Sequence, residues 1–310
     1  MSIYTDLSKP DCISLLQQYA LGDYIHHEGI VAGTTNSNYF LYTSSGEYVI
    51  TIFEKLSAQS LVFYQKLLTH LAAQSFPCAP LLPNQQGQPI VIYHHKPLGI
   101  MPRLAGTHVT QITTSDCHAV GSLLAQLHEK TQTLTEKKPN PFSARWYHQT
   151  AHEMRDDVST QQGILLEKAL RIYDNIPWET LPRGIIHADL FPDNVLFVEQ
   201  TLTGVVDFYF ACTDPFAFDV AIGVNAWCMP AQVLDVAGYH AMLGAYQHAR
   251  AFSLMEQTHW PALLVAAGLR FWLSRLHAKR ITKAEPHIQI HDPLMYEKIV
   301  AFHLNHQNSL

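Results

Sequence analysis

The sequence has no excess of basic residues. It contains 20 Lys and Arg against 26 Asp and Glu, which gives a formal net charge of -6 at pH 7. A protein whose main partner is a nucleic-acid backbone calls for a basic surface. We therefore expect no nucleic-acid partner.

Cysteine is scarce as well, and its spacing shows no pairing pattern. There is no C-x-x-C pair and nothing like the density of a disulfide-rich domain. Such a sparse set is typical of reduced thiols in the cytosol. The thiols expected to be reduced are those of Cys12, Cys78, Cys117, Cys212 and Cys228.

Long apolar runs are also missing. The N-terminus has no basic region followed by an apolar core, so we predict no signal peptide. The most apolar late stretch, residues 261–273, contains Arg270 and is too short to span a bilayer. The 19 histidines are scattered without H-E-x-x-H or a similar spacing, so no zinc site is predicted. We expect a cytoplasmic protein with no membrane partner.

What the chain does contain is enough apolar sequence for a large core. It has 310 residues, of which 47% are hydrophobic and 15% are charged, as is typical of a globular protein. This length fits two lobes better than one small core. The sequence therefore predicts a folded, two-lobed protein.

The most informative stretch is residues 185–207. It contains the sequence H-A-D ending at Asp189, then Asn194 after four residues, then Asp207 at the end of a short apolar run. Phosphoryl transfer needs a group that orients the attacking hydroxyl, and oxygen ligands that hold magnesium on the nucleotide phosphates. Protein kinases supply these groups from H-x-D-x-x-x-x-N and a downstream D-F. The spacing predicts Asp189 as the base and Asn194 and Asp207 as magnesium ligands.

Each part of this pattern is common when it occurs alone. Asp and Asn at the ends of a hairpin are ordinary turn residues. Here the intervening sequence reads as two short strands, 195–198 and 203–206, joined by a turn. A hairpin brings its ends together, so one magnesium ion could contact both Asn194 and Asp207. The combined pattern favours a kinase-like catalytic loop. The ordinary aspartate pKa, near 4, is low for a base, but it suffices if proton transfer is late.

The first hundred residues predict a small sheet with one main helix. Runs rich in aromatic and β-branched residues alternate with Gly-containing turns. We expect strands at 24–31, 38–43, 48–53, 89–94 and 98–101, and helices at 8–20 and 57–74. Residues 102–106 break the pattern. The predicted organisation is a nucleotide-binding lobe at 1–101, a hinge at 102–106 and a catalytic and acceptor-binding lobe at 107–310.

A turn of small residues, 32–38, lies between the first two predicted strands. Such a turn can place backbone N–H groups and hydroxyls against phosphate oxygens. It has one Gly where G-x-G-x-x-G has three, and most loops of this kind are simple hairpin turns. Its position ahead of the catalytic stretch favours a nucleotide-binding role for Thr34, Asn36, Ser37 and Asn38.

From residue 114 onward the chain is predicted to be mostly helical. Two polar residues stand out within apolar helical patterns. His128 is expected to be a packed helix residue rather than a catalytic group. Asp219 is expected to be buried, and because a buried acid needs partners, we predict that it binds backbone N–H groups of the catalytic loop. The expected helices are 115–131, 146–157, 163–173, 216–228, 231–251 and 261–281.

Taken together, these stretches resemble the aminoglycoside-phosphotransferase/choline-kinase group, the small-molecule branch of the protein-kinase-like fold. Loops of this group often begin H-G-D, whereas here the loop is H-A-D-L-F-P-D-N. The resemblance covers nearly the whole chain, and within the group the chain is most similar to the bacterial homoserine kinases. The matching stretches are GIVAGTTNSNYF (29–40), EYVITIFE (47–54), MPRLAGTHV (101–109), HADLFPDNVLF (187–197), VVDFYFACTDPFAFDVAIGVNAWC (205–228) and LRFWLSRL (269–276).

The resemblance implies an α+β, bilobal protein-kinase-like fold. Its N-terminal lobe would be a small antiparallel sheet with one main helix, and its C-terminal lobe would be larger and mostly helical. It implies ATP-dependent phosphorylation of the hydroxyl of L-homoserine to O-phospho-L-homoserine, a threonine precursor, with ATP and Mg²⁺ as cofactors.

The resemblance also implies binding residues. The adenine would lie near Met101 and Arg103. The implied acceptor-pocket residues are Asp214, Asn225, Trp227, Arg270, Trp272 and Arg275. Of these, Arg270 and Arg275 are the better candidates for binding a carboxylate, because a guanidinium can bind it bidentately.

The chain departs from the wider kinase pattern in the third strand. Thr51 stands where a lysine usually touches the nucleotide phosphates, and the following helix, 57–74, has no acid to pair with such a lysine. Which group contacts the phosphates instead stays open. Two alternatives also remain: a kinase of another small hydroxyl acceptor, such as choline, methylthioribose or an aminoglycoside, and a nucleotide-binding pseudokinase. A pseudokinase, however, would have no need of a base at Asp189.

Overall fold

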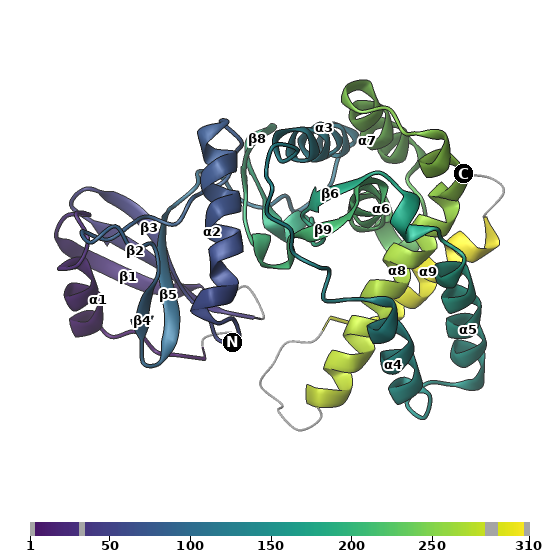
Figure 1. Cartoon of the computed structure of the whole chain (residues 1–310), viewed down its shortest axis with the longest axis horizontal. Helices are drawn as coiled ribbons and strands as arrows, with labels where there is room; N and C mark the ends of the chain where they lie inside the picture. The colour runs from purple at the N-terminus through teal and green to yellow at the C-terminus, as the bar shows by residue number, and fades with distance from the viewer. Residues whose placement is uncertain (1–3, 31–34, 283–290, 307–310) are drawn as a thin grey trace. The chain divides into compact units, whose positions relative to one another are not determined.

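The computed structural model describes residues 4–30, 35–282 and 291–306. The described chain divides into two compact units, which meet in sequence between Ala105 and Gly106 (Figure 1). The first unit contains the residues up to Ala105 together with Thr203–Val206. The second contains the remaining described residues.

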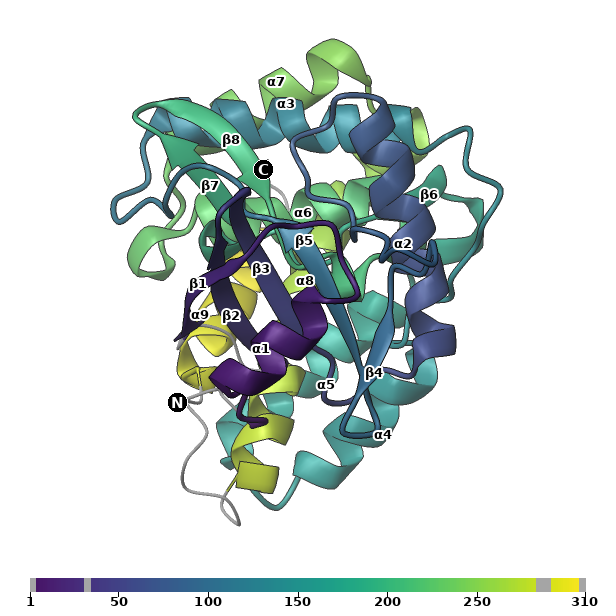
Figure 2. The same cartoon turned by 90° about the vertical axis from the view of Figure 1, so that its left-hand side faces the viewer.

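The first unit is built on a five-stranded antiparallel sheet (Figure 2). Its strand order is β1-β2-β3-β5-β4, so the last two strands in sequence are exchanged in space. The strands are β1 (Tyr24–Ile30), β2 (Ser37–Thr43), β3 (Gly46–Ile52), β4 (Val91–Tyr93) and β5 (Lys96–Pro102). This arrangement confirms the predicted N-terminal antiparallel sheet.

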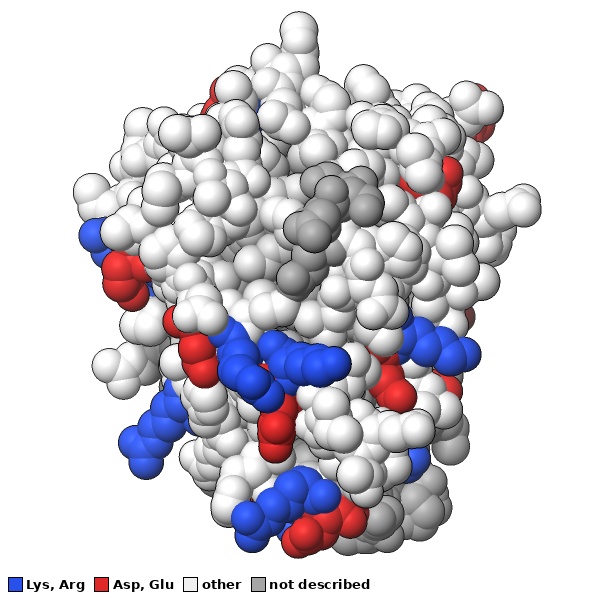
Figure 3. All heavy atoms as spheres, turned by 90° about the vertical axis from the view of Figure 1, so that its right-hand side faces the viewer, with Lys and Arg blue, Asp and Glu red and all other residues white. Residues whose placement is uncertain are grey.

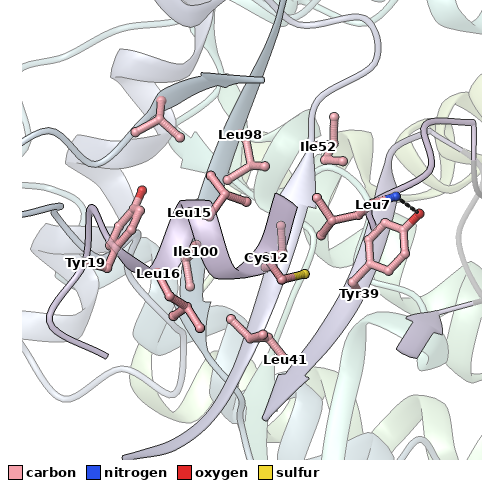
Figure 4. Close-up of a cluster of buried hydrophobic side chains, with 12 residues drawn as sticks. Leu7, Cys12, Leu15, Leu16, Tyr19, Tyr39, Leu41, Ile52, Leu98 and Ile100 are labelled. Atoms are coloured by element: carbon pink, nitrogen blue, oxygen red, sulfur yellow. Dashed lines mark hydrogen bonds between the residues drawn. The ribbon is translucent and has the colours of Figure 1, made fainter. Parts of the chain in front are cut away.

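One face of this sheet packs against a short helix, α1 (Lys9–Leu16). Every second residue of β2 is buried, because alternate side chains of a strand point to opposite faces. Tyr39 and Leu41 of β2 lie in a cluster with Cys12 and Leu15 of α1, and the Tyr39 hydroxyl accepts a hydrogen bond from the Leu7 backbone N–H (Figure 4). This face is therefore closed by the core of the first unit.

The other face of the sheet carries a different set of side chains. Asn38 is paired across the ladder with Thr51, and Val49 with Met101. Directly paired residues share a face. The main helix of the unit, α2 (Ala58–Ala73), begins after the Ser57 cap and buries residues at spacings of three and four, as its sequence predicts.

The second unit is mostly helical. Its helices are α3 (Thr114–Lys130), α4 (Ala144–Met154), α5 (Thr160–Asp174), α6 (Phe216–Trp227), α7 (Val236–Ala249), α8 (Leu254–Thr282) and α9 (Pro293–Asn305). Helix α8 begins at Leu254, seven residues before the predicted start at Pro261, and α9 was not predicted from the sequence. Two short sheets are also present. Strand β6 (Arg183–Ile186) pairs with β9 (Cys212–Pro215) within this unit, and β7 (Val195–Val198) pairs with β8 (Thr201–Val205), of which residues 203–205 are counted with the first unit.

Helix α6 forms the centre of the second unit. All of its residues except one are buried, including Asp219 and Asn225. Helices α3 and α7 approach closely beside it, and a Cβ atom added at Gly121 of α3 would lie 2.1 Å from the Met242 carbonyl oxygen of α7. Glycine at this position allows the two helix backbones to touch.

One face of the protein carries few charged side chains. In Figure 3, blue Lys and Arg side chains lie beside red Asp and Glu side chains, mainly in the lower part of this face, and most of the face is uncharged. Within the described ranges, no helix has the length and apolar character needed to cross a membrane.

Candidate active site

Asp219 of α6 anchors the loop that begins at His187, directly after β6. The backbone N–H groups of His187 and Ala188 donate hydrogen bonds of 2.8 Å to the two carboxylate oxygens of Asp219. His128 Nε2 lies 3.1 Å from Asp219 Oδ2, and His128 Nδ1 lies 2.8 Å from the Tyr246 hydroxyl. These contacts confirm that Asp219 binds the loop backbone and that His128 is a packed helix residue.

The charge of Asp219 survives burial because of these partners. Burial acts to raise its pKa, but the hydrogen bonds and charges of His128 and His187 outweigh it and hold the pKa below the usual range. Burial lowers the pKa of His128. A carboxylate that accepts several N–H groups is expected to stay ionised in this way.

Ala188 lies in a strained backbone conformation. Its φ of 63° is in the left-handed region, which costs a non-glycine residue about 1 kcal/mol or more. Kinases of the group often have Gly at this position, because Gly adopts positive φ without a steric cost. The hydrogen bond from the Ala188 N–H to Asp219 helps to hold this conformation directly before Asp189.

Asp189 is half-buried and oriented by Asn194. Asn194 Nδ2 donates to the Asp189 carbonyl oxygen at 2.8 Å and lies 3.3 Å from Asp189 Oδ2. Burial raises the pKa of Asp189 to about 7, against the attraction of Arg270, and the charges of Asp207 and Asp193 raise it further. The expectation of an ordinary pKa was therefore wrong for the free protein. A value near neutrality suits a general base.

Asp207 is the second strained residue of the site. Its φ of 58° and ψ of 57° are left-handed, and its Oδ1 atom is buried with no hydrogen-bond partner among the described residues. Burial raises its pKa to about 6, and the charge of Asp193 adds to this effect. Strained backbone and an unpaired buried oxygen are both typical of functional positions.

The positions of Asn194 and Asp207 fit a magnesium ion. Asn194 precedes β7 and Asp207 follows β8, so the two residues flank the open end of one hairpin. The Asn194 amide nitrogen donates a hydrogen bond to Asp189, so the Asn194 amide oxygen is left to serve as a metal ligand. Within the described residues no group of three or more His, Cys, Asp and Glu could hold a metal. Mg²⁺ does not need one, because it is usually held by one or two protein oxygens together with phosphates and water.

Arg270 of α8 is a buried cation beside Asp189. It is 4% exposed, and its guanidinium carbon lies 4.0 Å from the ring centre of Phe142 and 3.9 Å from that of Phe271. Its NH2 atom has no hydrogen-bond partner among the described residues. Burial lowers its pKa, and the carboxylate of Asp189 is the strongest influence in the opposite direction. An unpaired buried charge is costly unless an anion binds it.

The two other predicted residues of α8 lie nearby. Arg275 is half-buried, donates to the Asp292 carbonyl oxygen at 3.2 Å and lies 4.5 Å from the ring centre of Tyr296. Burial lowers its pKa, while the charges of Asp292 and Asp189 act to raise it. Trp272 is fully buried, and its Nε1 atom has no partner in the described chain. The structure thus brings both Arg270 and Arg275 within electrostatic reach of Asp189.

Three further acceptor candidates already have protein partners. Asn225 donates to the Leu264 carbonyl oxygen, and its own oxygen contacts His303, so it ties α6 to α8 and α9. Trp227 Nε1 donates to the Leu190 carbonyl oxygen at 2.9 Å and so supports the catalytic loop.

Asp214 is the third of these candidates. Its carboxylate accepts hydrogen bonds from Asn140 at 2.6 Å and from Arg183 at 3.2 Å. It lines a cavity of about 470 Å³ that Tyr147 also lines but Asp189 does not. The acceptor-binding roles of Asp214, Asn225 and Trp227 stay predictions.

The nucleotide candidates belong to the first unit. Thr34 lies outside the described residues, and Asn36 is buried. The Ser37 hydroxyl accepts from the Thr5 backbone N–H and donates to Glu54, on the face that packs against α1. Asn38 lies on the opposite face, where its Oδ1 accepts a 2.8 Å hydrogen bond from Thr51. The structure therefore places Ser37 and Asn38 on different faces of the sheet.

Arg103 and Met101 lie at the end of β5. Arg103 donates to Glu47 at 2.9 Å and to the Tyr42 hydroxyl at 2.8 Å, and it stacks 4.1 Å from the ring centre of Phe40. The pairing of Val49 with Met101 places Met101 on the face of Thr51.

The one Lys–Glu ion pair among the described residues of the first unit does not replace the missing kinase pair. It joins Lys96 to Glu54. Glu54 also binds Ser37, so this ion pair lies on the face of α1, opposite Thr51.

The structure also reveals neighbours of Arg270 that the sequence did not suggest. Phe142, Tyr147 and Tyr296 come from the segment before α4, from α4 and from α9. No motif marks them, and they are far from Arg270 in sequence. Only folding brings them to the site.

Comparisons with known proteins place the chain among related sequences. The sequence profile of the phosphotransferase enzyme family matches residues 26–253. The homoserine kinase of Burkholderia multivorans is 37% identical over 324 aligned residues, which cover 100% of this chain and 98% of the relative. A homoserine kinase of Burkholderia ambifaria is 38% identical, covering 97% of this chain and 95% of the relative.

Solved structures show the same fold. A microcompartment-associated aminopropanol kinase has a TM-score of 0.75 at 15% identity, covering 97% of this chain and 98% of its own. An amicoumacin kinase in complex with AMP-PNP, Ca²⁺ and Ami has a TM-score of 0.70 at 14% identity, covering 94% of this chain and 92% of its own. A spectinomycin phosphotransferase bound to ADP and spectinomycin has a TM-score of 0.67 at 11% identity, covering 96% and 95%. These likenesses confirm the predicted fold class.

Proposed function

The chain belongs to the phosphotransferase enzyme family and is a kinase, and from that premise we propose that it phosphorylates the hydroxyl of L-homoserine with ATP. The resemblance to bacterial homoserine kinases is confirmed by 37% identity over the whole chain. The product would be O-phospho-L-homoserine, a precursor of threonine.

The observation that carries the choice of acceptor is the buried, unpaired guanidinium of Arg270. It lies among aromatic rings next to Asp189 and lacks an ion-pair partner within the described chain. A carboxylate of an amino-acid acceptor would supply the missing anion, and guanidinium binds carboxylate bidentately. An acceptor without an anion would leave this charge unpaired, which favours homoserine over an amino alcohol or a sugar.

In the proposed reaction, Asp189 orients the acceptor hydroxyl. The hydroxyl oxygen bonds to the γ-phosphorus of ATP, the bond from that phosphorus to the β–γ bridging oxygen breaks, and ADP leaves with that electron pair. The hydroxyl proton passes to the Asp189 carboxylate. Asn194 fixes the Asp189 backbone, and Asp219 fixes the two residues before it. Catalysis then rests mainly on positioning, as is usual for phosphoryl transfer.

We propose that Asn194 and Asp207 hold Mg²⁺, which supplies charge neutralisation on the nucleotide phosphates when bound. The unpaired Oδ1 atom of Asp207 supports this assignment. For the nucleotide, Asn38, Met101 and Arg103 are the better-supported candidates, because Asn38 and Met101 share the sheet face that α1 leaves open. The Ser37 side chain is engaged with Glu54.

A coupled ADP-release assay tests the proposal. The acceptor panel is L-homoserine, L-serine, L-threonine, choline, methylthioribose and an aminoglycoside, each with MgATP. We expect release that depends on homoserine and that Asp189→Asn abolishes while nucleotide binding persists. Release with choline or a sugar but not with homoserine would refute the acceptor and keep the kinase assignment. Binding of ATP without turnover of any acceptor would favour a pseudokinase.

A further inference from the structure

Buried polar atoms without partners are concentrated in the second unit. Native proteins leave few such atoms, and each one calls for an explanation. In the described ranges, Tyr296 of α9 has one of them: its ring is fully buried and its hydroxyl has no hydrogen-bond partner. The same is true of the NH2 atom of Arg270.

Contacts connect Tyr296 directly to the catalytic loop. Phe191 follows Asp189 by two residues, and its N–H donates to the Asp189 carbonyl oxygen at 2.9 Å. The ring centres of Phe191 and Tyr296 are 6.3 Å apart, and those of Phe271 and Tyr296 are 5.2 Å apart. Phe271 is also the ring that lies 3.9 Å from the Arg270 guanidinium. Tyr296 and Arg270 therefore flank the same aromatic group beside Asp189.

We propose that the Tyr296 hydroxyl and the Arg270 guanidinium together bind the carboxylate of the acceptor, which makes Tyr296 a specificity-determining residue of the proposed homoserine kinase. The inference rests on that proposed function and adds to it the residue on α9. The phenol donates its O–H to one carboxylate oxygen, and the guanidinium donates N–H groups to the carboxylate.

The electrostatic surroundings suit this role. Burial holds the pKa of Tyr296 well above its usual range, so the hydroxyl keeps its proton and acts as a donor. Arg275 lies over the Tyr296 ring at 4.5 Å and adds positive charge on the same side. Removing one hydrogen bond to a charged ligand group typically weakens binding about tenfold or more.

A simpler role for Tyr296 is packing between α8 and α9. In that case its hydroxyl contributes nothing to acceptor binding. The two roles differ in what Tyr296→Phe does, because this change removes the oxygen without opening a cavity. Tyr19→Phe is a matched control, since Tyr19 of the first unit is also buried with an unpaired hydroxyl and belongs to none of the proposed sites.

The experiment compares wild type, Tyr296→Phe and Tyr19→Phe on two acceptors with MgATP. One acceptor is L-homoserine and the other is 3-aminopropan-1-ol, which is homoserine without its carboxylate. We expect Tyr296→Phe to raise the KM for homoserine about tenfold, with the KM for ATP and the kcat/KM for 3-aminopropan-1-ol unchanged. Tyr19→Phe should behave as wild type. Thermal melts establish that both variants are folded.

Each outcome decides a different point. If wild type phosphorylates homoserine and Tyr296→Phe has the same KM, the inference is wrong and the proposed function stands. If Tyr296→Phe weakens both acceptors equally, the hydroxyl does not recognise the carboxylate and the inference is wrong. If folded wild type phosphorylates 3-aminopropan-1-ol but not homoserine, the proposed function fails and the inference falls with it.

Discussion

The change Asp219→Asn tests how the catalytic loop is held in place. The Asp219 carboxylate accepts the N–H groups of His187 and Ala188 and contacts His128, and all of these groups are buried. Asparagine has the same shape but only one acceptor oxygen. It can satisfy one of the two N–H groups, and its amide nitrogen then faces the other. The substitution therefore removes a charge and leaves a buried donor unpaired.

The size of the effect follows from these contacts. A charge-assisted hydrogen bond contributes about 1.5–3 kcal/mol, and an unsatisfied buried donor costs about 1–3 kcal/mol. We expect Asp219→Asn to lower the free energy of unfolding by about 3–5 kcal/mol, in the range seen when one partner of a buried charged pair is removed. Because the backbone before Asp189 loses its anchor, kcat should fall roughly tenfold to a hundredfold.

Urea denaturation followed by tryptophan fluorescence measures the first quantity. All five tryptophans lie in the second unit, so the signal reports the unit that contains Asp219. The control is Asp235→Asn, because Asp235 caps α7 through the Ala237 N–H and Asn caps helices equally well. A loss below about 1 kcal/mol with unchanged kcat would refute the assigned role of Asp219.

The pH dependence gives a second check on the same variant. The partners of Asp219 hold its folded-state pKa below its unfolded value. Its contribution to stability is then complete above the unfolded pKa, about 3.9, and is lost as the pH falls through the lower folded pKa. The stability difference between wild type and Asp219→Asn should therefore shrink under acid conditions. A difference that stays constant down to acid unfolding would contradict this reasoning.

Four other predictions concern the same site. Because the pKa of Asp189 is raised to about 7 in the free protein and the base must be deprotonated, kcat/KM for homoserine should increase as the pH rises through about 7, measured by initial rates with homoserine and MgATP both below their KM. Asp189→Asn should abolish turnover yet raise the free energy of unfolding by about 1 kcal/mol, because a buried carboxylate with a raised pKa opposes folding when ionised; a destabilised variant in urea denaturation would contradict this. Ala188→Gly should stabilise the protein by up to about 1 kcal/mol, since φ is 63° there, and a lower melting temperature would argue against strain at Ala188. Arg270→Gln should raise the KM for homoserine at least tenfold without changing the KM for ATP, and equal losses for both substrates would point to a folding defect.

The sequence by itself determined the features that depend on local spacing. Asp189 and Asn194 lie in the loop between β6 and the β7–β8 hairpin, and Asp207 lies just after that hairpin. Because this stretch of chain is short, the spacing of the three residues in sequence predicts that they lie close together. The strands and helices were predictable from the period at which apolar residues recur. This period reflects the backbone geometry of each element and the burial of one of its faces. The buried acid Asp219 was predictable because an ion inside an apolar helix must find partners.

Tertiary structure alone decided the environment of these groups. The raised pKa of Asp189 and the unpaired guanidinium of Arg270 depend on burial by rings from distant segments, such as Phe142 and Phe271. Tyr296 reaches the site only because α9 packs on α8. Ser37 and Asn38 are adjacent in β2 and so point to opposite faces, but only the packing of α1 decided that Ser37 lies on the closed face. The burial of a side chain, its hydrogen-bond partners and its pKa all depend on contacts with residues far apart in sequence. No local sequence pattern can therefore predict them.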